Sequence, residues 1–258
     1  MAAPRNILKE NLANGKMQVG LWMGFGSATV AEIASRAGFD WCLIDAEHNP
    51  NSDKSAMSQL QAMNGAPAQA VMRVTSGQDW LLKRALDIGV QSLLVPLIDT
   101  AEEAAVMARA VRYPPEGNRG MGAIQARATG YGADSDYVAS ANEQICLMVQ
   151  AESRKAIENI DAIAATEGVD VVFIGPADLS ADMGYPGQPD APEVVTAIEY
   201  SVSRILAAGK AVGTITFNPD QIGYYKALGV TFLGVGGDVA TFASSVRALA
   251  RHAQEQIK

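Results

Sequence analysis

Apolar runs and helical segments alternate along this chain from end to end, and this alternation constrains its fold more than any other feature. The runs are bounded by turn residues and are typical of buried parallel strands. We predict strands over Gln18–Met23, Trp41–Asp45, Gln69–Arg73, Ser92–Leu97, Ile145–Gln150, Val169–Ile174, Ala211–Thr216 and Thr231–Val235. Because a helical segment follows each strand, we expect a parallel sheet closed into a (β/α)8 TIM barrel, in one domain over residues 1–258. An open doubly wound sheet is the alternative, but no G-x-G-x-x-G motif follows the first strand.

The helical segments have apolar periodicity, and most of them stop just before a glycine. We predict helices over Thr29–Ala37, Ser55–Asn64, Trp80–Ile88, Ala101–Val111, Lys155–Thr166, Glu193–Ala208, Gln221–Leu228 and Thr241–Gln256. The glycines that we expect at helix C-caps are Gly38, Gly65, Gly89, Gly168, Gly209 and Gly229. The segment Tyr113–Asn142 is too long for a plain connection, so we expect a lid, a binding loop or an interface element.

The composition narrows the classes of function. A length of 258 residues, of which 48% are hydrophobic, suits one α/β barrel with a large core. The net charge is −8 and no basic patch is present, so we expect no nucleic-acid partner. No apolar run is long enough to span a bilayer and the N-terminus lacks an apolar signal core, so we expect no membrane partner. Cys42 and Cys146 lie in apolar runs, which indicates reduced core thiols in a cytoplasmic protein.

Charged residues gather where the predicted strands end, and in a barrel those ends meet at one rim. The second strand runs into Asp45-Ala46-Glu47-His48, which contains one of the two histidines of the chain. An imidazole beside carboxylates can act as a general base near neutral pH. Taken alone, this segment could equally be a surface turn with a solvated histidine.

Glu152 and Asp178 follow the neighbouring fifth and sixth strands. Two carboxylates on adjacent strand ends can share one divalent cation, with water and substrate oxygens completing the octahedron. Such oxygen ligation suits Mg²⁺ or Mn²⁺ and admits Co²⁺. Each residue also has a plainer interpretation, as a helix N-terminal acid for Glu152 and as an N-cap or Asx-turn for Asp178.

Arg73 ends the third strand, where a guanidinium could stabilise a developing enolate oxygen. A structural salt bridge with an acid of the rim is the alternative role for this residue. Gly175-Pro176-Ala177 precede Asp178, and backbone N–H groups there could hold a carboxylate, unless the segment is a simple turn.

The positions of the lysines bear on the type of chemistry. A Schiff-base aldolase needs a desolvated lysine that faces the barrel interior. None of the eight lysines ends a predicted strand, and Lys210 lies at the opposite end of the seventh strand. Metal-assisted enolisation is therefore favoured over imine chemistry.

Several segments resemble the HpcH/HpaI family of class II pyruvate aldolases, and they span nearly the whole chain in order. They are GLWMGFGSATVAEIASRAGFDWCLIDAEHNPN, LDIGVQSLLVPLIDT, VRYPPEGNRGMG, VQAESRKAIENID and GVDVVFIGPADLSADMGYPG. The segment IGPADLSADMGYPG together with RYPP-x-G-x-RG is highly specific, whereas DAEH alone is not. The resemblance implies a divalent-metal-dependent aldolase that acts on a 2-oxo acid, pyruvate or hydroxypyruvate, and on an aldehyde.

The resemblance also implies catalytic roles. Glu152 and Asp178 match the metal ligands of the family. His48 matches the base, held by Asp45 as its acidic partner. Arg73 matches the arginine that contacts the ketone oxygen of the substrate.

Other positions at the strand ends are expected to contact the substrate. Gln150 matches a substrate-contacting glutamine, and the segment from Gly175 matches a backbone cradle for the carboxylate. Relatives commonly have Gly where this chain has Ala46, and smaller apolar residues where it has Phe217, which should narrow the aldehyde pocket. The expected substrate-binding residues are Trp22, Gln150, Gly175, Pro176, Ala177 and Phe217.

The family typically forms hexamers, built as trimers of dimers that exchange the last helix, here Thr241–Gln256. Asp87 matches an acid that similar enzymes lend to the site of a neighbouring subunit. Two other functions stay open. A carbon–carbon lyase of the malyl-CoA or citryl type would need cationic groups for a nucleotide, and no additional C-terminal segment supplies them. A non-catalytic binding barrel would not need the acids, the base and the cation of the rim.

Overall fold

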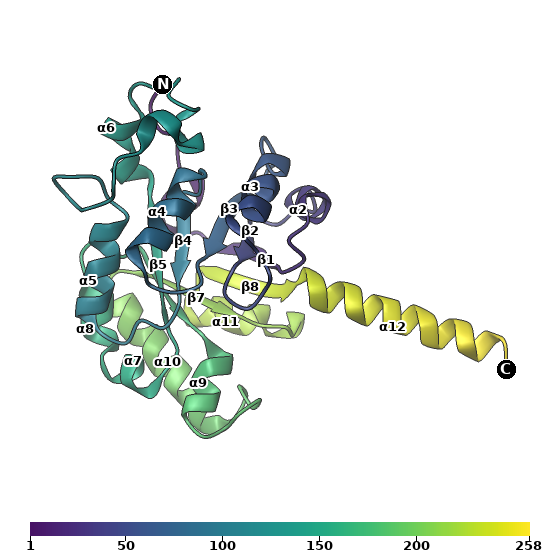
Figure 1. Ribbon diagram of the computed structural model, residues 1–258. Helices are drawn as coiled ribbons and strands as arrows, with labels where there is room; N and C mark the ends of the chain where they lie inside the picture. The colour runs from purple at the N-terminus through teal and green to yellow at the C-terminus, as the bar shows by residue number, and fades with distance from the viewer.

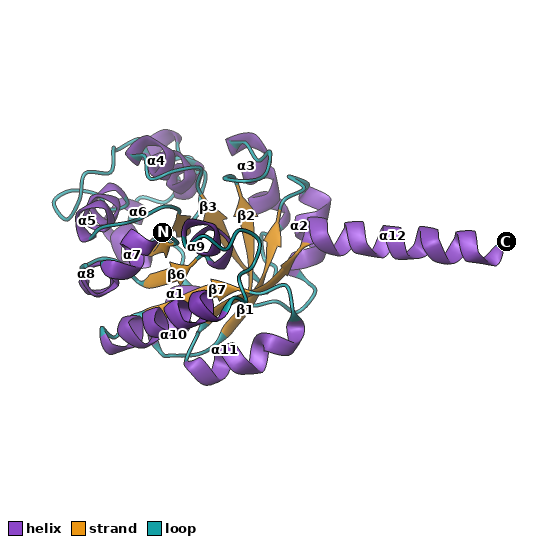
Figure 2. Cartoon of the chain, turned by 90° about the horizontal axis from the view of Figure 1, so that it is seen from below, coloured by secondary structure: helices purple, strands orange, loops and turns teal.

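A computed structural model of residues 1–258 confirms the predicted barrel. Eight parallel strands follow one another in chain order, and the last pairs with the first to close the sheet. Figures 1 and 2 show the strands at the centre with helices around them. Because the strands run parallel, their C-terminal ends meet at one end of the barrel, the mouth, and their N-terminal ends at the other, the floor.

The strands lie close to the predicted ranges, with identical bounds for the first three and shifts of one or two residues for the others. They are β1 (Gln18–Met23), β2 (Trp41–Asp45), β3 (Gln69–Arg73), β4 (Ser92–Val95), β5 (Cys146–Ala151), β6 (Val171–Ile174), β7 (Ala211–Ile215) and β8 (Phe232–Gly237). The helices are α1 (Ile7–Ala13), α2 (Ala28–Ser35), α3 (Asp53–Ala62), α4 (Asp79–Asp87), α5 (Ala101–Ala110), α6 (Tyr137–Ala141), α7 (Arg154–Glu158), α8 (Ile160–Ala165), α9 (Pro176–Asp182), α10 (Pro192–Ala207), α11 (Ile222–Leu228) and α12 (Asp238–Gln256). The glycines predicted at helix C-caps all have positive φ angles, between 73° and 105°.

Four elements differ from the prediction. Helices α1, α6 and α9 were not predicted, because α1 and α6 are short and α9 begins in a segment that reads as a loop. The predicted helix Lys155–Thr166 is broken at Asn159 into α7 and α8. The long segment after α5 carries α6 and short 3-10 turns and lies beside the N-terminus, at the floor end (Figure 1). It is therefore not a lid over the mouth of its own chain.

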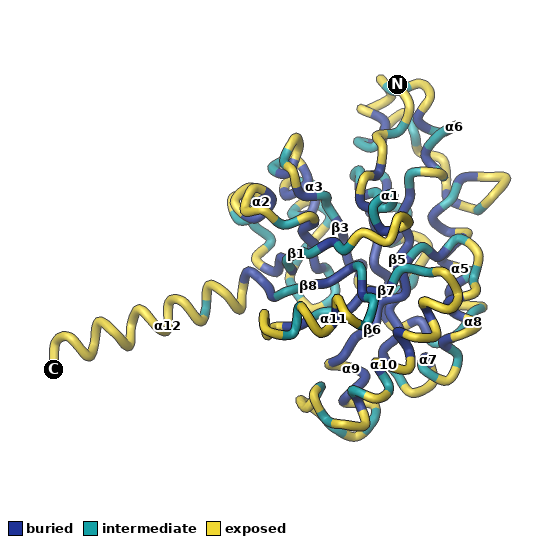
Figure 3. The backbone as a smooth tube through the Cα atoms, turned by 180° about the vertical axis from the view of Figure 1, so that it is seen from behind, coloured by how far each residue is buried: buried dark blue, intermediate teal, exposed yellow.

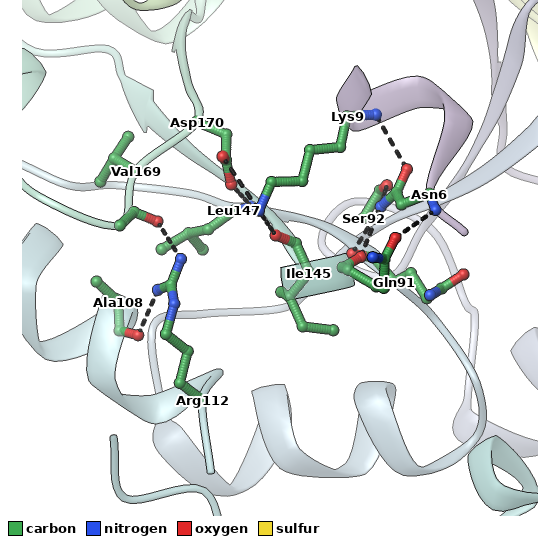
Figure 4. A network of polar contacts seen from close by, with 12 residues as sticks. Asn6, Lys9, Gln91, Ser92, Ala108, Arg112, Ile145, Leu147, Val169 and Asp170 are labelled. Atoms are coloured by element: carbon green, nitrogen blue, oxygen red, sulfur yellow. Dashed lines mark hydrogen bonds and ion pairs between the residues drawn. The ribbon is translucent and has the colours of Figure 1, made fainter. Parts of the chain in front are cut away.

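A polar network fastens α1 across the floor (Figure 4). Asn6 caps α1 by accepting from Lys9 N at 3.0 Å, and its Nδ2 donates to Ser92 Oγ at 3.0 Å. Lys9 Nζ donates to the Ile145 carbonyl at 2.7 Å and lies 3.5 Å from Asp170 Oδ1. These contacts join the helix to the starts of β4 and β5 and to the chain before β6, so α1 closes the floor of the barrel.

Aromatic rings fill the barrel interior against glycines in the strands. Trp41 stacks on Phe232 with ring centroids 4.0 Å apart, and its ring occupies the space that a Cβ at Gly20 would need. A Cβ at Gly234 would come within 2.7 Å of the Trp22 ring. The interior is thus a packed core, which leaves chemistry to the residues at its mouth.

Helix α12 projects from the end of β8 and packs on the barrel only near its start (Figures 1 and 3). Its exposed apolar residues include Val239, Phe242, Val246 and Leu249, which recur at helical spacing. Phe242 contacts Phe25 with ring centroids 5.6 Å apart. No helix of the chain is both long and apolar enough to cross a membrane.

Candidate functional site

Asp45 and Arg73 form a buried ion pair between the ends of β2 and β3. They are register partners on the two strands, and Arg73 Nε and Nη2 donate to the two Asp45 oxygens, each at 2.8 Å. This bidentate geometry is the strongest that the two groups can make. Burial opposes the charge on Asp45, but the hydrogen bonds and charge of Arg73 outweigh it and hold the pKa of Asp45 below its usual value. Asp45 is therefore ionised at neutral pH.

Glu47 lies on the remaining side of the same guanidinium. Its Oε2 is 2.9 Å from Arg73 Nη1 and 3.9 Å from His48 Nε2. This buried oxygen has no well-aligned hydrogen bond, so its contact with Arg73 is mainly electrostatic. Burial raises the pKa of Glu47, although the charges of Arg73 and His48 act to lower it. Glu47 is thus more easily protonated than an ordinary glutamate.

His48 lies at the edge of this cluster, with its side chain 62% exposed. The predicted contact with Asp45 is not formed in the single chain. Asp45 accepts instead from Arg73, from the Glu47 N–H at 3.1 Å and from Asn49 Nδ2 at 2.6 Å. The cause is the register of β2 and β3, which sets Arg73 directly beside Asp45.

Glu152 is buried directly after β5. Its Oε1 accepts the Leu97 N–H at 2.9 Å, and its Oε2 accepts from Gln150 Nε2. Burial, followed by the charge of Asp178, raises the pKa of Glu152 to about 7, while the Leu97 N–H acts to lower it. The structure therefore holds a carboxylate where negative charge is poorly compensated by the chain itself.

Gln150 and Gly175 enclose this carboxylate. Gln150 Oε1 is buried and has no hydrogen-bond partner, so a donor from a ligand could satisfy it. A Cβ at Gly175 would overlap the Glu152 carboxylate and come within 3.0 Å of Gln150 Nε2. Only glycine fits there, because the backbone passes directly against the carboxylate.

The segment from Gly175 forms the start of α9 rather than a loop. The Gly175 N–H already donates to the Ala151 carbonyl at 3.2 Å, and Pro176 has no N–H. Leu179 is the first residue whose N–H bonds within α9, so the N–H groups of Ala177 and Asp178 have no acceptor inside the helix. Of the predicted carboxylate cradle, only the N–H groups of Ala177 and Asp178 are therefore free to donate to a ligand.

The rim offers two carboxylates, Glu152 and Asp178, to a divalent cation. No three His, Cys, Asp or Glu side chains converge closely enough to hold a metal by themselves. The exposed Asp178 is near enough for its charge to add to the burial that raises the pKa of Glu152. Two clustered carboxylates that form no ion pair within the chain fit a metal that takes its other ligands from water and substrate.

Trp22 and Phe217 occupy different levels of the mouth. Trp22 is buried in the barrel interior, with its ring 5.8 Å from Arg73 Cζ. Phe217 follows β7 with its side chain largely free, and the residue is 66% exposed. Trp22 therefore supports the arginine from below, whereas Phe217 is open to a substrate.

Asp87 lies at the opposite end of the barrel from these residues. It ends α4, which runs antiparallel to the strands, and its side chain is 27% exposed. Arg119 Nη2 donates to Asp87 Oδ1 at 2.8 Å, and Arg119 in turn stacks on Tyr113 at 4.3 Å. The role of Asp87 in a neighbouring subunit stays a prediction, but this position excludes a role at the mouth of its own chain.

Three contacts of the site were not anticipated from the sequence. Glu47 was placed at the rim without a role, Asn49 holds Asp45, and the Leu97 backbone holds Glu152. The acidic DAEH segment could have pointed to Glu47, but no sequence signal reports a backbone donor. None of the eight lysines stands at the C-terminal end of a strand, as expected.

Comparisons with known proteins agree with this description. The family model for HpcH/HpaI aldolase/citrate lyase matches residues 18–245. The chain is 51% identical over 249 residues to a hydroxypyruvate/pyruvate aldolase of Agrobacterium fabrum, covering 96% of this chain and 94% of the relative. It is 46% identical over 241 residues to a 2-keto-3-deoxy-L-rhamnonate aldolase of Escherichia coli, covering 93% and 90%. A solved HpcH/HpaI aldolase/citrate lyase family protein from Burkholderia cenocepacia superposes with a TM-score of 0.93 at 36% identity, covering 96% of this chain and 99% of that one.

Proposed function

The chain belongs to the HpcH/HpaI aldolase/citrate lyase family, and from this premise we propose that it is a divalent-metal-dependent aldolase. It would reversibly join a 2-oxo acid to an aldehyde through an enolate. The observation that carries this proposal is the buried Glu152 carboxylate beside Asp178 and within the field of Arg73, in a barrel with no lysine on its strands. We propose that residues 1–258 act as one catalytic domain.

Glu152 and Asp178 would hold the cation, as Mg²⁺, Mn²⁺ or Co²⁺. When bound, the cation would supply a Lewis acid that makes the C3 protons of the 2-oxo acid more acidic. The N–H groups of Ala177 and Asp178 would receive the substrate carboxylate, and Gln150 would contact the substrate beside Glu152.

Arg73 would stabilise negative charge as it develops on the ketone oxygen. Asp45 and Glu47 hold this guanidinium from two sides, so it would meet the oxygen without first having to reorganise. His48 would remove or return the proton, with Glu47 as the nearest acid in its own chain. Asp45 would act through Arg73, by fixing its orientation.

The similar proteins suggest the donor, and the residues at the mouth suggest how the acceptor approaches. We propose pyruvate or hydroxypyruvate as the donor, because a relative named hydroxypyruvate/pyruvate aldolase matches nearly the whole chain. The aldehyde would approach past Phe217, whose exposed ring would narrow its space. Trp22 would shape the bottom of the same pocket.

Assembly would complete the enzyme. We propose a homohexamer, a trimer of dimers in which α12 packs on a neighbouring subunit and covers its exposed apolar residues. Asp87 would then act in the site of a neighbouring subunit. The unpaired, buried Cys42 and Cys146 agree with the reducing cytoplasm that we propose as its location.

The first test is deuterium exchange at C3 of pyruvate in D₂O, followed by NMR. The protein is stripped with EDTA and then supplied with Mg²⁺, Mn²⁺ or Co²⁺. Exchange should require metal and should be lost in Glu152→Ala and in Asp178→Ala, which would establish enolate formation before any aldehyde is known.

Other results of this test would change the assignment. Exchange with hydroxypyruvate alone would replace the donor. No exchange with either acid, together with saturation by a CoA ester, would favour the acyl-CoA lyase. If metal-loaded His48→Ala and Arg73→Ala both kept full turnover, the proposed mechanism would be abandoned.

A further inference from the structure

Leu97 has a backbone conformation that a leucine seldom adopts. It follows β4 with a φ of 57°, and it is one of two non-glycine residues in the chain with positive φ. In this left-handed region the Cβ crowds the following carbonyl oxygen. The residue is also 62% exposed, so burial of its side chain does not compensate for the strain.

The strained turn directs two successive N–H groups at the end of β5. The Leu97 N–H donates to Glu152 Oε1 at 2.9 Å, and the Ile98 N–H donates to the Gln150 carbonyl at 3.0 Å. Gln150 Nε2 is the other donor to Glu152, and it binds Oε2. Each carboxylate oxygen therefore receives one donor from the chain and keeps lone pairs for another ligand.

We propose that Leu97 is a positioning residue for metal binding, in that its left-handed backbone aims the N–H at Glu152 Oε1 and so sets the orientation in which this carboxylate meets a divalent cation. The proposal rests on the proposed function, which places the cation on Glu152 and Asp178. Strained residues persist only where the surrounding structure holds them, and they cluster at functional sites. Here the hydrogen bond from Leu97 would keep the Glu152 side chain in one rotamer before the cation binds.

The test uses two substitutions with opposite demands on the backbone. Leu97→Ile keeps the same atoms and a similar exposed area, but its branched Cβ makes the left-handed region much less accessible. Leu97→Asn changes the side chain more, but asparagine tolerates that region well. Mn²⁺ binding to the EDTA-stripped full chain is measured by EPR titration, with thermal unfolding of the metal-free protein in parallel.

Leu97→Ile should bind Mn²⁺ about tenfold or more weakly, which is the loss typical when a group that orients a metal ligand is removed. Leu97→Asn should bind Mn²⁺ with an affinity within about twofold of the wild type, because the backbone N–H at position 97 still points at Glu152 Oε1. If Leu97→Ile lowers the melting temperature but binds Mn²⁺ like the wild type, the strain is only structural and the proposal is overturned. Equal weakening in both variants would also overturn it.

Glu152→Gln separates this proposal from the one on which it rests. If Glu152→Gln loses Mn²⁺ and Leu97→Ile does not, the metal site stands and the positioning role fails. If the wild type binds no Mn²⁺, or Glu152→Gln binds it normally, both proposals fail.

Should Leu97→Ile not fold, amide hydrogen exchange decides. The Leu97 N–H should exchange at least about tenfold faster in Glu152→Ala than in the wild type, because it loses its acceptor. The Ile98 N–H, which bonds to the Gln150 carbonyl, serves as the internal reference. An unchanged rate at Leu97 would show that Glu152 does not hold this N–H and would overturn the proposal.

Discussion

The polar network around α1 at the floor of the barrel differs from the cluster of acids at its mouth. At the floor, Asn6, Lys9 and Asp170 bind backbone groups at the strand starts, although buried polar atoms of Thr231, Tyr113 and Arg119 have no hydrogen-bond partner. At the mouth, buried oxygens of Glu47 and Gln150 have no hydrogen bond. Burial, and after it the negative charge of neighbouring acids, raises the pKa values of Glu152 and Glu47, and the backbone after β4 is strained.

This difference separates stability from function within one fold. The hydrogen-bonded network around α1 at the floor secures the elements that close the barrel. Unsatisfied acceptors and clustered acids at the mouth are unfavourable in the chain alone, and a cation and a substrate can relieve them. Substitutions at the mouth should therefore change activity, whereas substitutions at the floor should change stability alone.

The largest effect is expected at Arg73. Arg73→Met should lower kcat/KM for aldol cleavage by roughly 10³-fold, about 4 kcal/mol, because the developing oxyanion loses its cation. It should also destabilise the fold by about 3 kcal/mol, since Asp45 and Glu47 keep buried charge without a partner. Steady-state kinetics and urea unfolding measure the two effects.

Arg73→Lys is the matched control. It keeps the charge but loses the fork that holds Asp45 through two donors, so its losses should fall between those of the wild type and Arg73→Met. Full activity in Arg73→Met would show that this arginine stabilises the fold but not the developing oxyanion.

The next effect is the pH dependence of stability in the metal-free protein, which arises at Glu152. The unfolded chain releases this proton near pH 4.5, whereas the folded chain keeps it up to about pH 7. The stability that the protonated carboxyl contributes is therefore complete below pH 4.5 and is lost as the pH rises through 7. Unfolding by urea at pH 5 and pH 8 should show a loss of about 3 kcal/mol from this group.

Glu152→Gln provides the reference, because an amide cannot ionise. The wild type should lose more stability than this variant between the two pH values, and Mn²⁺ should restore the wild type alone at pH 8. Parallel loss in both proteins would show that other groups cause the pH dependence.

The fold could be predicted almost completely from the sequence. Apolar runs and capping glycines report local structure, so the first three strands have the predicted bounds and the glycines after helices have positive φ. Helix α1 was missed because its stability comes from packing of Leu8 and Leu12 against the barrel interior, which a short segment does not reveal. The break at Asn159 was missed because the apolar pattern continues across it.

The gathering of these residues at the mouth could be predicted, but their contacts could not. Residues at strand ends must share the mouth, and the structure places Asp45, Arg73 and Glu152 there. The partner of Asp45 depends on the register of β2 and β3, which no local pattern encodes, and it proved to be Arg73 rather than His48. The N–H of Leu97 could not be predicted either, since it depends on a backbone angle.

A substitution at the floor should lower stability and leave activity unchanged. Asn6→Ala removes the cap of α1 and leaves buried partners at Ser92 and Gln144 unsatisfied, so the free energy of unfolding should fall by about 2 kcal/mol. The kcat/KM of the folded enzyme should stay unchanged. Asn14→Ala, at the exposed end of the same helix, should change stability by less than about 0.5 kcal/mol. A large loss of kcat/KM in folded Asn6→Ala would break the proposed division between the two ends.

The smallest effect is expected at Phe217, where it should alter the choice of aldehyde more than the rate. Phe217→Ala removes an exposed ring, so stability should change by less than about 0.5 kcal/mol. The ratio of kcat/KM for a bulky aldehyde to that for a small one, such as benzaldehyde and glycolaldehyde, should rise about fivefold, or about 1 kcal/mol. Tyr200→Ala, an exposed aromatic on α10 away from the mouth, should leave the ratio unchanged. An unchanged ratio in Phe217→Ala as well would place the aldehyde elsewhere on the rim and would limit the functional part of the mouth to the side from β2 to β6.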